Sequence, residues 1–147
     1  NKRRIIRALE VIYATGGKFS EQRKTGKPMF NALKIGIKIA KTDSEERIVA
    51  RTKIMINEGL TEEVRRLHKK YPWSLVPMQS IDYQEFKDYF EGKKNLAQTV
   101  ELINRHHLAY GKRQMTWFKK DKDIYWVPAD PKPALTQAVI LIQKFLN

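Results

Sequence analysis

The chain has no cysteine among its 147 residues, which excludes disulfide-stabilised scaffolds and thiolate metal sites. It also lacks an apolar run of the roughly 18 to 20 residues that a membrane-spanning helix requires. No signal peptide precedes the first helical pattern. These absences fit a reducing compartment, so we expect a cytoplasmic protein that does not enter a membrane.

Several motifs of catalysis and ligand binding are missing as well. The chain contains no GxxxxGKS/T phosphate loop, no GxSxG turn, no HExxH motif and no EF-hand loop. The stretches "TGGKFS" and "TGKP" lack the first glycine of a phosphate loop at the required spacing. His106 and His107 are adjacent and would point about 100° apart on a helix. We therefore expect no metal site within this chain.

Charge of one sign dominates the composition. The 29 basic residues outnumber the 16 acidic ones, which gives a net charge of +13 and a pI near 10.0. Such a surface attracts polyanions, a nucleic acid first and an anionic membrane second. Most of the excess lies in residues 1–41, with eleven basic and two acidic residues, and in residues 104–147, with eight and three. These regions are either contact surfaces or ordinary solvated faces.

Hydrophobic periodicity predicts one domain that is mainly α with two short strands. The first strand, "LKIGIKIA" at 33–40, alternates isoleucine with lysine and glycine, which predicts one buried face. Residues 128–133, "PADPKP", resemble a linker. Helices are expected at 2–14, 44–58, 62–71, 82–91, 96–120 and 134–146, and the second strand at 124–127.

Three residues are predicted to cap helices. Asp43 and Asn95 each precede a glutamate or a glutamine by three residues, which is the spacing of a capping box. Thr61 is expected to cap the helix that follows Gly59.

Four segments occur in an order that is specific in combination. They are "NKRRIIRALEVIYATGGKFSE", "RIVARTKIMINEGLTEEVRRL", "SIDYQEFKDYFEGKKNLAQTVELI" and "AYGKRQMTWFKKDKDIYWV". From Asn1 to about Val127 the chain resembles the carboxy-terminal part of tRNA dimethylallyltransferases, also called tRNA isopentenyltransferases. This resemblance implies the carboxy-terminal part of an α/β phosphate-loop (P-loop NTPase-like) transferase with a helical insertion. Residues 1–30 would end the tRNA-binding insertion, and residues 31–147 would belong to the core and its tRNA-contacting helices.

Enzymes of this family move a dimethylallyl group from dimethylallyl diphosphate to N6 of the adenosine 3′ of the anticodon, at tRNA position 37, giving N6-isopentenyladenosine. The resemblance implies Mg²⁺ as a cofactor, nucleotide (ATP) binding at a phosphate loop, and a monomeric enzyme. The phosphate loop and the aspartate general base of the family lie in an amino-terminal segment that is missing from this sequence. We therefore expect a piece of a longer protein, without an Mg²⁺ ligand and inactive by itself.

The resemblance assigns Arg51, in "RIVARTKIM", to the departing diphosphate as the catalytic residue of this chain. A guanidinium offers phosphate oxygens a fixed fork that stays charged and stabilises the leaving group. Arg47, one turn earlier, is expected to be structural. Without the resemblance, Arg51 is more simply a helix-surface arginine paired with Asp43, Glu46 or Glu58.

The resemblance also implies three tRNA-contacting regions. Arg4 and Arg7 share a helix face that suits neighbouring phosphates, with a solvated face as the alternative. Tyr83 would stack on an extruded base or form part of the core. Asp82 stands where the family usually has glycine, and its charge and backbone preference oppose RNA binding there. The candidate residues are Arg3, Arg4, Arg7, Gln79, Ser80, Tyr83, Lys112, Arg113 and Gln114.

The third region is "YGKRQMTWFKK". Lys112 and Arg113 supply cations, and Gln114 would bond a base edge or a sugar hydroxyl. The run before the lysine is usually arginine-rich in the family, whereas residues 107–109 here are His, Leu and Ala. Residues 116–118, Thr-Trp-Phe, are expected to pack the end of the helix.

Two other functions remain open from the residues alone. One is a non-catalytic basic RNA-binding module, and the other is an interaction domain for an acidic partner or a membrane. Neither predicts the ordered match over four segments or an arginine at Arg51. The leading hypothesis is therefore part of a prenyltransferase whose partners are a tRNA anticodon stem-loop and dimethylallyl diphosphate.

Overall fold

A computed structural model describes residues 1–21 and 29–147, and these residues form two compact units. The first unit is Asn1–Ala32 and the second is Leu33–Asn147. The Gly- and Lys-rich stretch at 15–28, whose sequence indicates a loop, is described only as far as residue 21. The first unit contains helix α1 (Lys2–Thr15), which ends at Gly16 with a left-handed φ of 67° that favours glycine.

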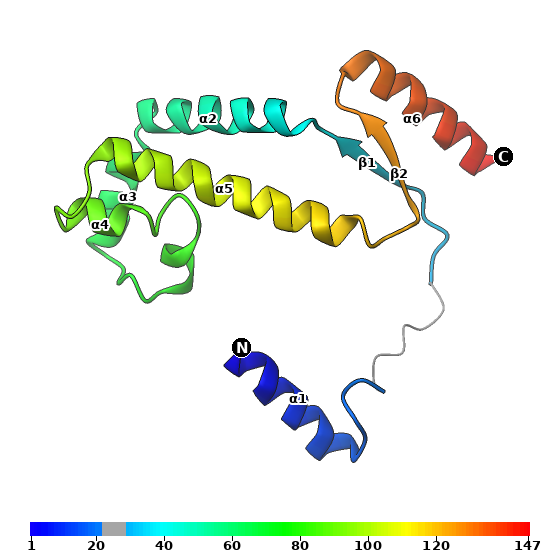
Figure 1. Ribbon diagram of the computed structural model, residues 1–147, viewed down its shortest axis with the longest axis horizontal. Helices are drawn as coiled ribbons and strands as arrows, with labels where there is room; N and C mark the ends of the chain where they lie inside the picture. The colour runs from blue at the N-terminus through cyan, green and yellow to red at the C-terminus, as the bar shows by residue number, and fades with distance from the viewer. Residues whose placement is uncertain (22–28) are drawn as a thin grey trace. The chain divides into compact units, whose positions relative to one another are not determined.

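The second unit is mainly helical with two strands, as predicted. Figure 1 shows α2 and α5 side by side, with α3 and α4 at one end of this pair and the strands with α6 at the other. A short 3₁₀ helix at Val76–Gln79 precedes α4. The elements are β1 (Lys34–Lys38), α2 (Lys41–Asn57), α3 (Leu60–His68), α4 (Phe86–Phe90), α5 (Leu96–Phe118), β2 (Ile124–Pro128) and α6 (Pro131–Leu146).

The core of the second unit lies where α3, α4 and α5 meet. Phe86 of α4, Val64 of α3 and Ile103 of α5 are completely buried and share one apolar cluster with Leu60 and Met78. Burying side chains of this size contributes about 1.5 to 3 kcal/mol each. This cluster therefore holds the short helix α4 and the loop before it against the long helix α5.

The two strands pair in parallel, with Gly36 opposite Trp126. A Cβ atom at Gly36 would lie 2.8 Å from Ile124 Cγ2 and 2.8 Å from Trp126 Cε3, so glycine lets these side chains cover the strand. Lys34 Nζ lies 2.7 Å from Asp121 Oδ2, just before β2. That hydrogen bond raises the pKa of Lys34 and lowers the pKa of Asp121.

We expect Gly36→Ala to lower the free energy of unfolding by about 1 to 3 kcal/mol, because the added methyl group overpacks the strand pair. Chemical denaturation monitored by tryptophan fluorescence measures the change. Gly111→Ala is the matched control, because Gly111 lies within α5 with nothing near its added Cβ. The control is expected to be neutral or stabilising. Equal stability of Gly36→Ala and the wild type would contradict the packing argument.

Of the two predicted capping boxes, the structure confirms one and contradicts the other. The capping box at Asn95 is confirmed, since Asn95 Oδ1 accepts from the Gln98 N–H at 2.9 Å and Gln98 Oε1 accepts from the Asn95 N–H at 2.9 Å. The box at Asp43 is wrong, because α2 already begins at Lys41 and Asp43 instead accepts a hydrogen bond from the Thr42 hydroxyl.

Two further helix starts differ from the prediction. Gly59, with φ of 101°, links α2 directly to α3, so α3 begins at Leu60 and Thr61 lies within its first turn. The expected linker at 128–133 is partly helical. Asp130 caps α6 by accepting from the Lys132 N–H at 3.2 Å, and Pro131 occupies the first turn, where a missing N–H costs nothing.

The buried face predicted for the first strand is only partly present among the described residues, where Leu33 and Ile35 are half-buried. Ile37 is 60% exposed and Ile39 is 40% exposed. Only β1 and β2 form the described sheet, and α6 contacts β2. Parallel strands are normally covered on both faces, so these isoleucines have the character of sheet residues without the neighbours that such residues need.

Candidate nucleic-acid interface

One face of α5 gathers cations around a hollow. Lys112, Arg113, Trp117 and Lys120 line a cavity of about 450 Å³ together with Ala109 and Thr116. These residues recur at spacings of three and four, which places them on one helix face. The backbone there is regular, and the Thr116 hydroxyl donates to the Lys112 carbonyl at 2.8 Å.

The face contains two of the three candidate residues of "YGKRQ". Lys112 and Arg113 are exposed, and the Arg113 guanidinium lies 5.9 Å from the centroid of the Tyr110 ring. Gln114 is exposed but does not line the cavity, since it points from a different side of the helix. The structure therefore places the two cations together and the amide apart from them.

Trp117 corrects the expectation that residues 116–118 pack the end of the helix. Its side chain is 69% exposed, and its described ring contact is with Phe118 at 5.1 Å, edge to face. Since no described element covers this end of α5, Trp117 adds an exposed aromatic ring to the cationic face. Trp117 and Lys120 were not predicted to belong to this surface. Their helical spacing from Lys112 and Arg113 was the signal that could have found them.

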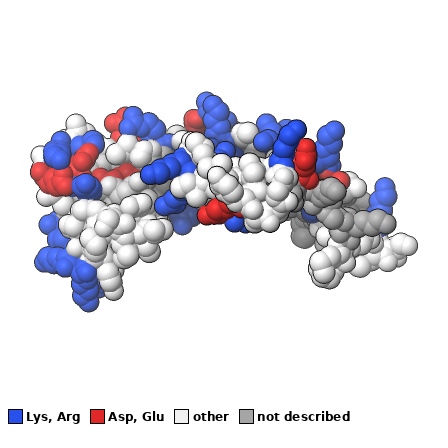
Figure 2. Space-filling view, turned by 90° about the horizontal axis from the view of Figure 1, so that it is seen from below, with Lys and Arg blue, Asp and Glu red and all other residues white. Residues whose placement is uncertain are grey.

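Total charge alone does not mark a binding surface. Figure 2 shows lysine and arginine side chains spread over the face in view, with acidic side chains between them. The cavity on α5 is distinguished by its lining, which combines Lys112, Arg113 and Lys120 with one exposed indole and no carboxylate. That combination suits a single-stranded nucleic acid, because cations meet phosphates and an aromatic ring stacks on a base.

The loop "QSIDYQ" is held by its own hydrogen bonds. The Gln79 amide donates to the Ser74 carbonyl at 3.1 Å, and the Ser80 hydroxyl donates to the Pro77 carbonyl at 2.7 Å. Both side chains are exposed at the surface. Their bonds to the backbone fix the loop conformation and leave the remaining hydrogen-bonding capacity facing solvent.

Two histidines of α5 bind the same loop. His107 Nε2 lies 2.7 Å from Asp82 Oδ1, and His106 Nδ1 lies 2.5 Å from Glu85 Oε1. The buried Glu85 also accepts a hydrogen bond from the Asp82 N–H at 2.9 Å through its other carboxylate oxygen. The loop and α5, two of the three regions expected to contact tRNA, are therefore joined by direct side-chain contacts.

Asp82 keeps the backbone conformation expected of glycine. Its φ is 80°, the one positive value at a non-glycine position among the described residues. Asparagine and aspartate tolerate this region better than other side chains. The Asp82 carboxylate is directed to His107, so part of its charge is engaged with α5.

Tyr83 lies at the edge of the core. The ring is half-buried against the apolar cluster, and its hydroxyl donates to Glu63 of α3. This hydrogen bond is the main reason why the pKa of Tyr83 is raised, and burial adds to it. Of the two alternatives for Tyr83, this structure shows the second: the ring packs against the core. Its stacking on RNA stays a prediction.

We expect Glu63→Gln to lower the pKa of Tyr83 towards the ordinary tyrosine value of 10.0, because the carboxylate is lost. Tyrosinate absorbance during an alkaline titration measures it, and the difference between wild type and Tyr83→Phe identifies the signal. A raised pKa favours the neutral hydroxyl, so the contact stabilises the fold below about pH 10 and is lost as the pH rises through the raised value. An unchanged Tyr83 titration in Glu63→Gln would contradict the assigned cause.

Arg51 is an exposed residue of α2, one turn after Arg47. The next residue, Thr52, is buried and bonds the Ile48 carbonyl at 3.0 Å, so the backbone at Arg51 is fixed while its side chain faces outward. No ion pair joins Arg51 to a carboxylate within residues 1–21 and 29–147. The alternative that paired it with Asp43, Glu46 or Glu58 finds no support there.

Arg3, Arg4 and Arg7 are all exposed on α1, in the first unit. Arg7 pairs with Glu10 at 3.2 Å, an exposed contact of the kind that contributes little to stability. Arg3 and Arg4 form no ion pair with any described residue.

The described part of the chain offers neither a helix suited to span a membrane nor a cluster of metal ligands. No described helix has both the length and the apolar character needed to cross a bilayer. Within the same residues, no three His, Asp or Glu side chains gather in a way that could hold a metal ion.

The fold and this site define a basic, mainly helical unit with a parallel strand pair and a cation-rich helix face. A family model described as IPP transferase matches residues 1–121. The chain belongs to the IPP transferase family.

Curated relatives agree with this assignment. The chain is 41% identical over 144 residues to a tRNA dimethylallyltransferase of Microcystis aeruginosa, covering 98% of this chain and 46% of that protein. It is 38% identical over 139 residues to one from a Picosynechococcus species, covering 95% of this chain and 47% of that protein. The chain therefore spans about half the length of these relatives.

Solved structures agree on the fold. A full-length tRNA isopentenylpyrophosphate transferase of Bacillus halodurans matches with a TM-score of 0.76 and 29% identity, covering 99% of this chain and 46% of that chain. A tRNA delta(2)-isopentenylpyrophosphate transferase of Staphylococcus epidermidis matches with a TM-score of 0.72 and 29% identity, covering 98% and 49%.

Proposed function

We propose that this chain is the carboxy-terminal half of a cytoplasmic tRNA dimethylallyltransferase. The complete enzyme would transfer dimethylallyl from its diphosphate to N6 of the adenosine 3′ of the anticodon. In this proposal the chain supplies tRNA binding and one arginine for the diphosphate, and the rest of the enzyme supplies the phosphate loop and the base. The observation that carries the proposal is the family match over residues 1–121, combined with relatives about twice as long.

The cationic face of α5 supports the tRNA part of the proposal. Lys112, Arg113 and Lys120 would neutralise backbone phosphates, which supply most of the affinity of a protein for RNA. Trp117 would stack on a base of the anticodon loop, whose nucleotides are unpaired. The loop bearing Gln79 and Ser80 would form a second contact, held to α5 by the histidine pairs.

Arg51 would bind the diphosphate that leaves the allylic carbon. Its side chain is exposed, and the described residues offer it no carboxylate partner, so its charge is available to an anion. In the transfer, N6 of adenosine forms a bond to the allylic carbon while the carbon–oxygen bond to the diphosphate breaks. Negative charge grows on the diphosphate, and a fixed guanidinium stabilises that charge more in the transition state than in the ground state.

The strand pair supports the view that other parts of the enzyme cover this chain. Ile37 is exposed on a parallel sheet of two strands and Ile39 is exposed just after β1, an arrangement that usually belongs to a larger covered sheet. In the complete enzyme, Mg²⁺ would bind with the diphosphate and help to neutralise it. The described residues provide no cluster of ligands for that ion, so its ligands would come from elsewhere.

The decisive experiment is a transfer assay with dimethylallyl diphosphate and an unmodified tRNA that carries adenosine 3′ of the anticodon. Mass spectrometry of the digested tRNA would detect N6-isopentenyladenosine. We expect product with the complete protein and none with residues 1–147 alone. Product from residues 1–147 alone would contradict the division of labour. RNA binding without product from the complete protein would favour a non-catalytic RNA-binding module.

A further inference from the structure

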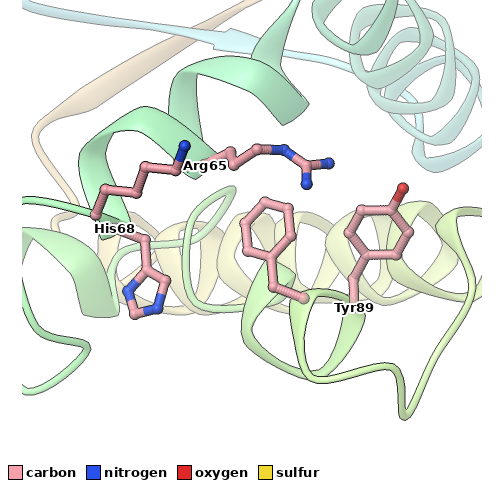
Figure 3. Close-up of a pocket in the computed structure, with 5 residues that line it drawn as sticks. Arg65, His68 and Tyr89 are labelled. Carbon is pink, nitrogen blue, oxygen red and sulfur yellow. The ribbon is translucent and has the colours of Figure 1, made fainter.

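A second pocket lies between α3 and α4. Its volume is about 470 Å³, and it is lined by Arg65, His68 and Lys69 at the end of α3 and by Tyr89 and Phe90 of α4 (Figure 3). None of these residues belongs to the regions that the sequence assigned to RNA or to the diphosphate. The pocket therefore requires its own explanation.

Arg65 and His68 are held in place before any ligand binds. The Arg65 guanidinium carbon lies 4.9 Å from the centroid of the Phe90 ring, and Arg65 Nε lies 3.3 Å from Glu62 Oε2. The His68 ring stacks on Trp73 with centroids 4.2 Å apart and planes 22° apart. Figure 3 shows the Arg65 guanidinium on the side of the pocket to which the Tyr89 hydroxyl points.

The lining favours an anion with a flat ring beside it. Arg65 and Lys69 are cations, and the Tyr89 hydroxyl is a donor, whereas no acidic side chain lines the pocket. His68 also lines the pocket, and its Nδ1 is buried without a hydrogen-bond partner within the described residues. The exposed edges of the aromatic residues supply a surface for a base or a ribose.

We propose that this pocket binds a nucleotide of the RNA substrate, with its phosphate on Arg65 and Lys69 and its base or ribose against Tyr89 and Phe90. The proposal rests on the proposed function, since it takes RNA as the ligand. A free diphosphate would also bind to Arg65 and Lys69. The aromatic wall favours a nucleotide over free diphosphate, because a base or a ribose can pack against Tyr89 and Phe90.

The pocket and the cationic face of α5 lie on different elements. The pocket is lined by residues of α3 and α4 and by Lys69 just after α3, whereas the face runs along α5 from Ala109 and ends at Lys120, just after it. An RNA that contacts both would bind through two linked sites, and the two contacts would reinforce each other.

Two double variants of the complete transferase test the proposal. Arg65→Ala with Lys69→Ala removes the pocket cations, and Arg66→Ala with Lys70→Ala removes the same charge from the same segment outside the pocket. Anisotropy of a labelled anticodon stem-loop gives the Kd, and thermal melting checks that each variant folds. We expect about a tenfold higher Kd for the pocket variant and less than a twofold change for the control.

The outcomes separate the proposal from its alternatives. Equal weakening by both variants would assign the effect to surface charge and overturn the pocket. An unchanged Kd in the pocket variant, beside a weakened variant of the α5 face, would overturn this site and leave the proposed function standing. Failure of the folded wild type to bind the stem-loop would overturn the proposed function first. Inorganic diphosphate binding that is lost in the pocket variant, with RNA binding intact, would overturn the choice of RNA.

Discussion

Arg51→Ala in the complete transferase is expected to lower kcat about 100- to 1000-fold, the range observed when one preorganised donor to a developing negative charge is removed. The KM for tRNA should change little, because Arg51 lies on α2 and would contact the diphosphate instead of the RNA. Steady-state rates of isopentenyladenosine formation, with each substrate varied in turn, separate kcat from KM. We therefore expect kcat to fall while the KM for tRNA stays nearly constant, because the chemical step is the one affected.

Arg47→Ala is the matched control for this prediction. Arg47 lies one turn earlier on the same exposed side of α2, so its loss changes helix charge equally. We expect it to retain most of its activity. Arg51→Lys keeps the charge without the planar fork and should fall between the wild type and Arg51→Ala. Equal losses from Arg47→Ala and Arg51→Ala would show that helix charge, and not a specific diphosphate contact, causes the effect.

The triple change of Lys112, Arg113 and Lys120 to alanine is expected to weaken anticodon stem-loop binding about 100-fold at low salt, since each removed cation abolishes one phosphate contact. The slope of log K against log salt should fall by about 2, at roughly 0.7 for each contact to single-stranded RNA. Anisotropy titrations of the complete transferase over a series of salt concentrations measure both quantities.

Control variants separate the α5 face from general charge. Lys119→Ala with Lys122→Ala removes neighbouring cations that do not line the cavity, and it should change the affinity only slightly. Trp117→Leu in the otherwise intact protein should weaken binding at every salt concentration alike, because stacking does not release counterions. A salt slope that is the same in the triple variant and the wild type would refute phosphate binding by this face.

Local sequence patterns predicted which segments are helical, but they predicted the first residue of each helix less reliably. Asn95 capped its helix as expected because both halves of the capping box lie within one turn and need no distant partner. Asp43 had the same local pattern, yet α2 begins two residues earlier and Asp43 bonds Thr42. Sequence spacing shows which hydrogen bonds are available within a turn, but it does not decide at which residue the helix begins.

The candidate site was predicted in part. Lys112 and Arg113 both line the cavity because each lies three or four residues before Thr116 or Trp117, and the sequence contains that spacing. Trp117 was expected to be packed because an aromatic residue after a helical run is usually buried. Its exposure depends on which elements lie beside the end of α5, and that is a tertiary fact. The histidine pairs with Asp82 and Glu85 join residues more than twenty positions apart, which no local pattern could specify.

Residue order alone specified the family, the basic character and the helical periodicity, since these depend on composition and on contacts within a few positions. It also placed Arg51 on a helix. Three features emerged from the three-dimensional fold instead: Arg51 is unpaired among the described residues, Trp117 joins the cations of α5, and a pocket forms between α3 and α4. The physical reason is that burial, ion pairing and cavities depend on which distant side chains meet, and distance along the chain does not encode those meetings.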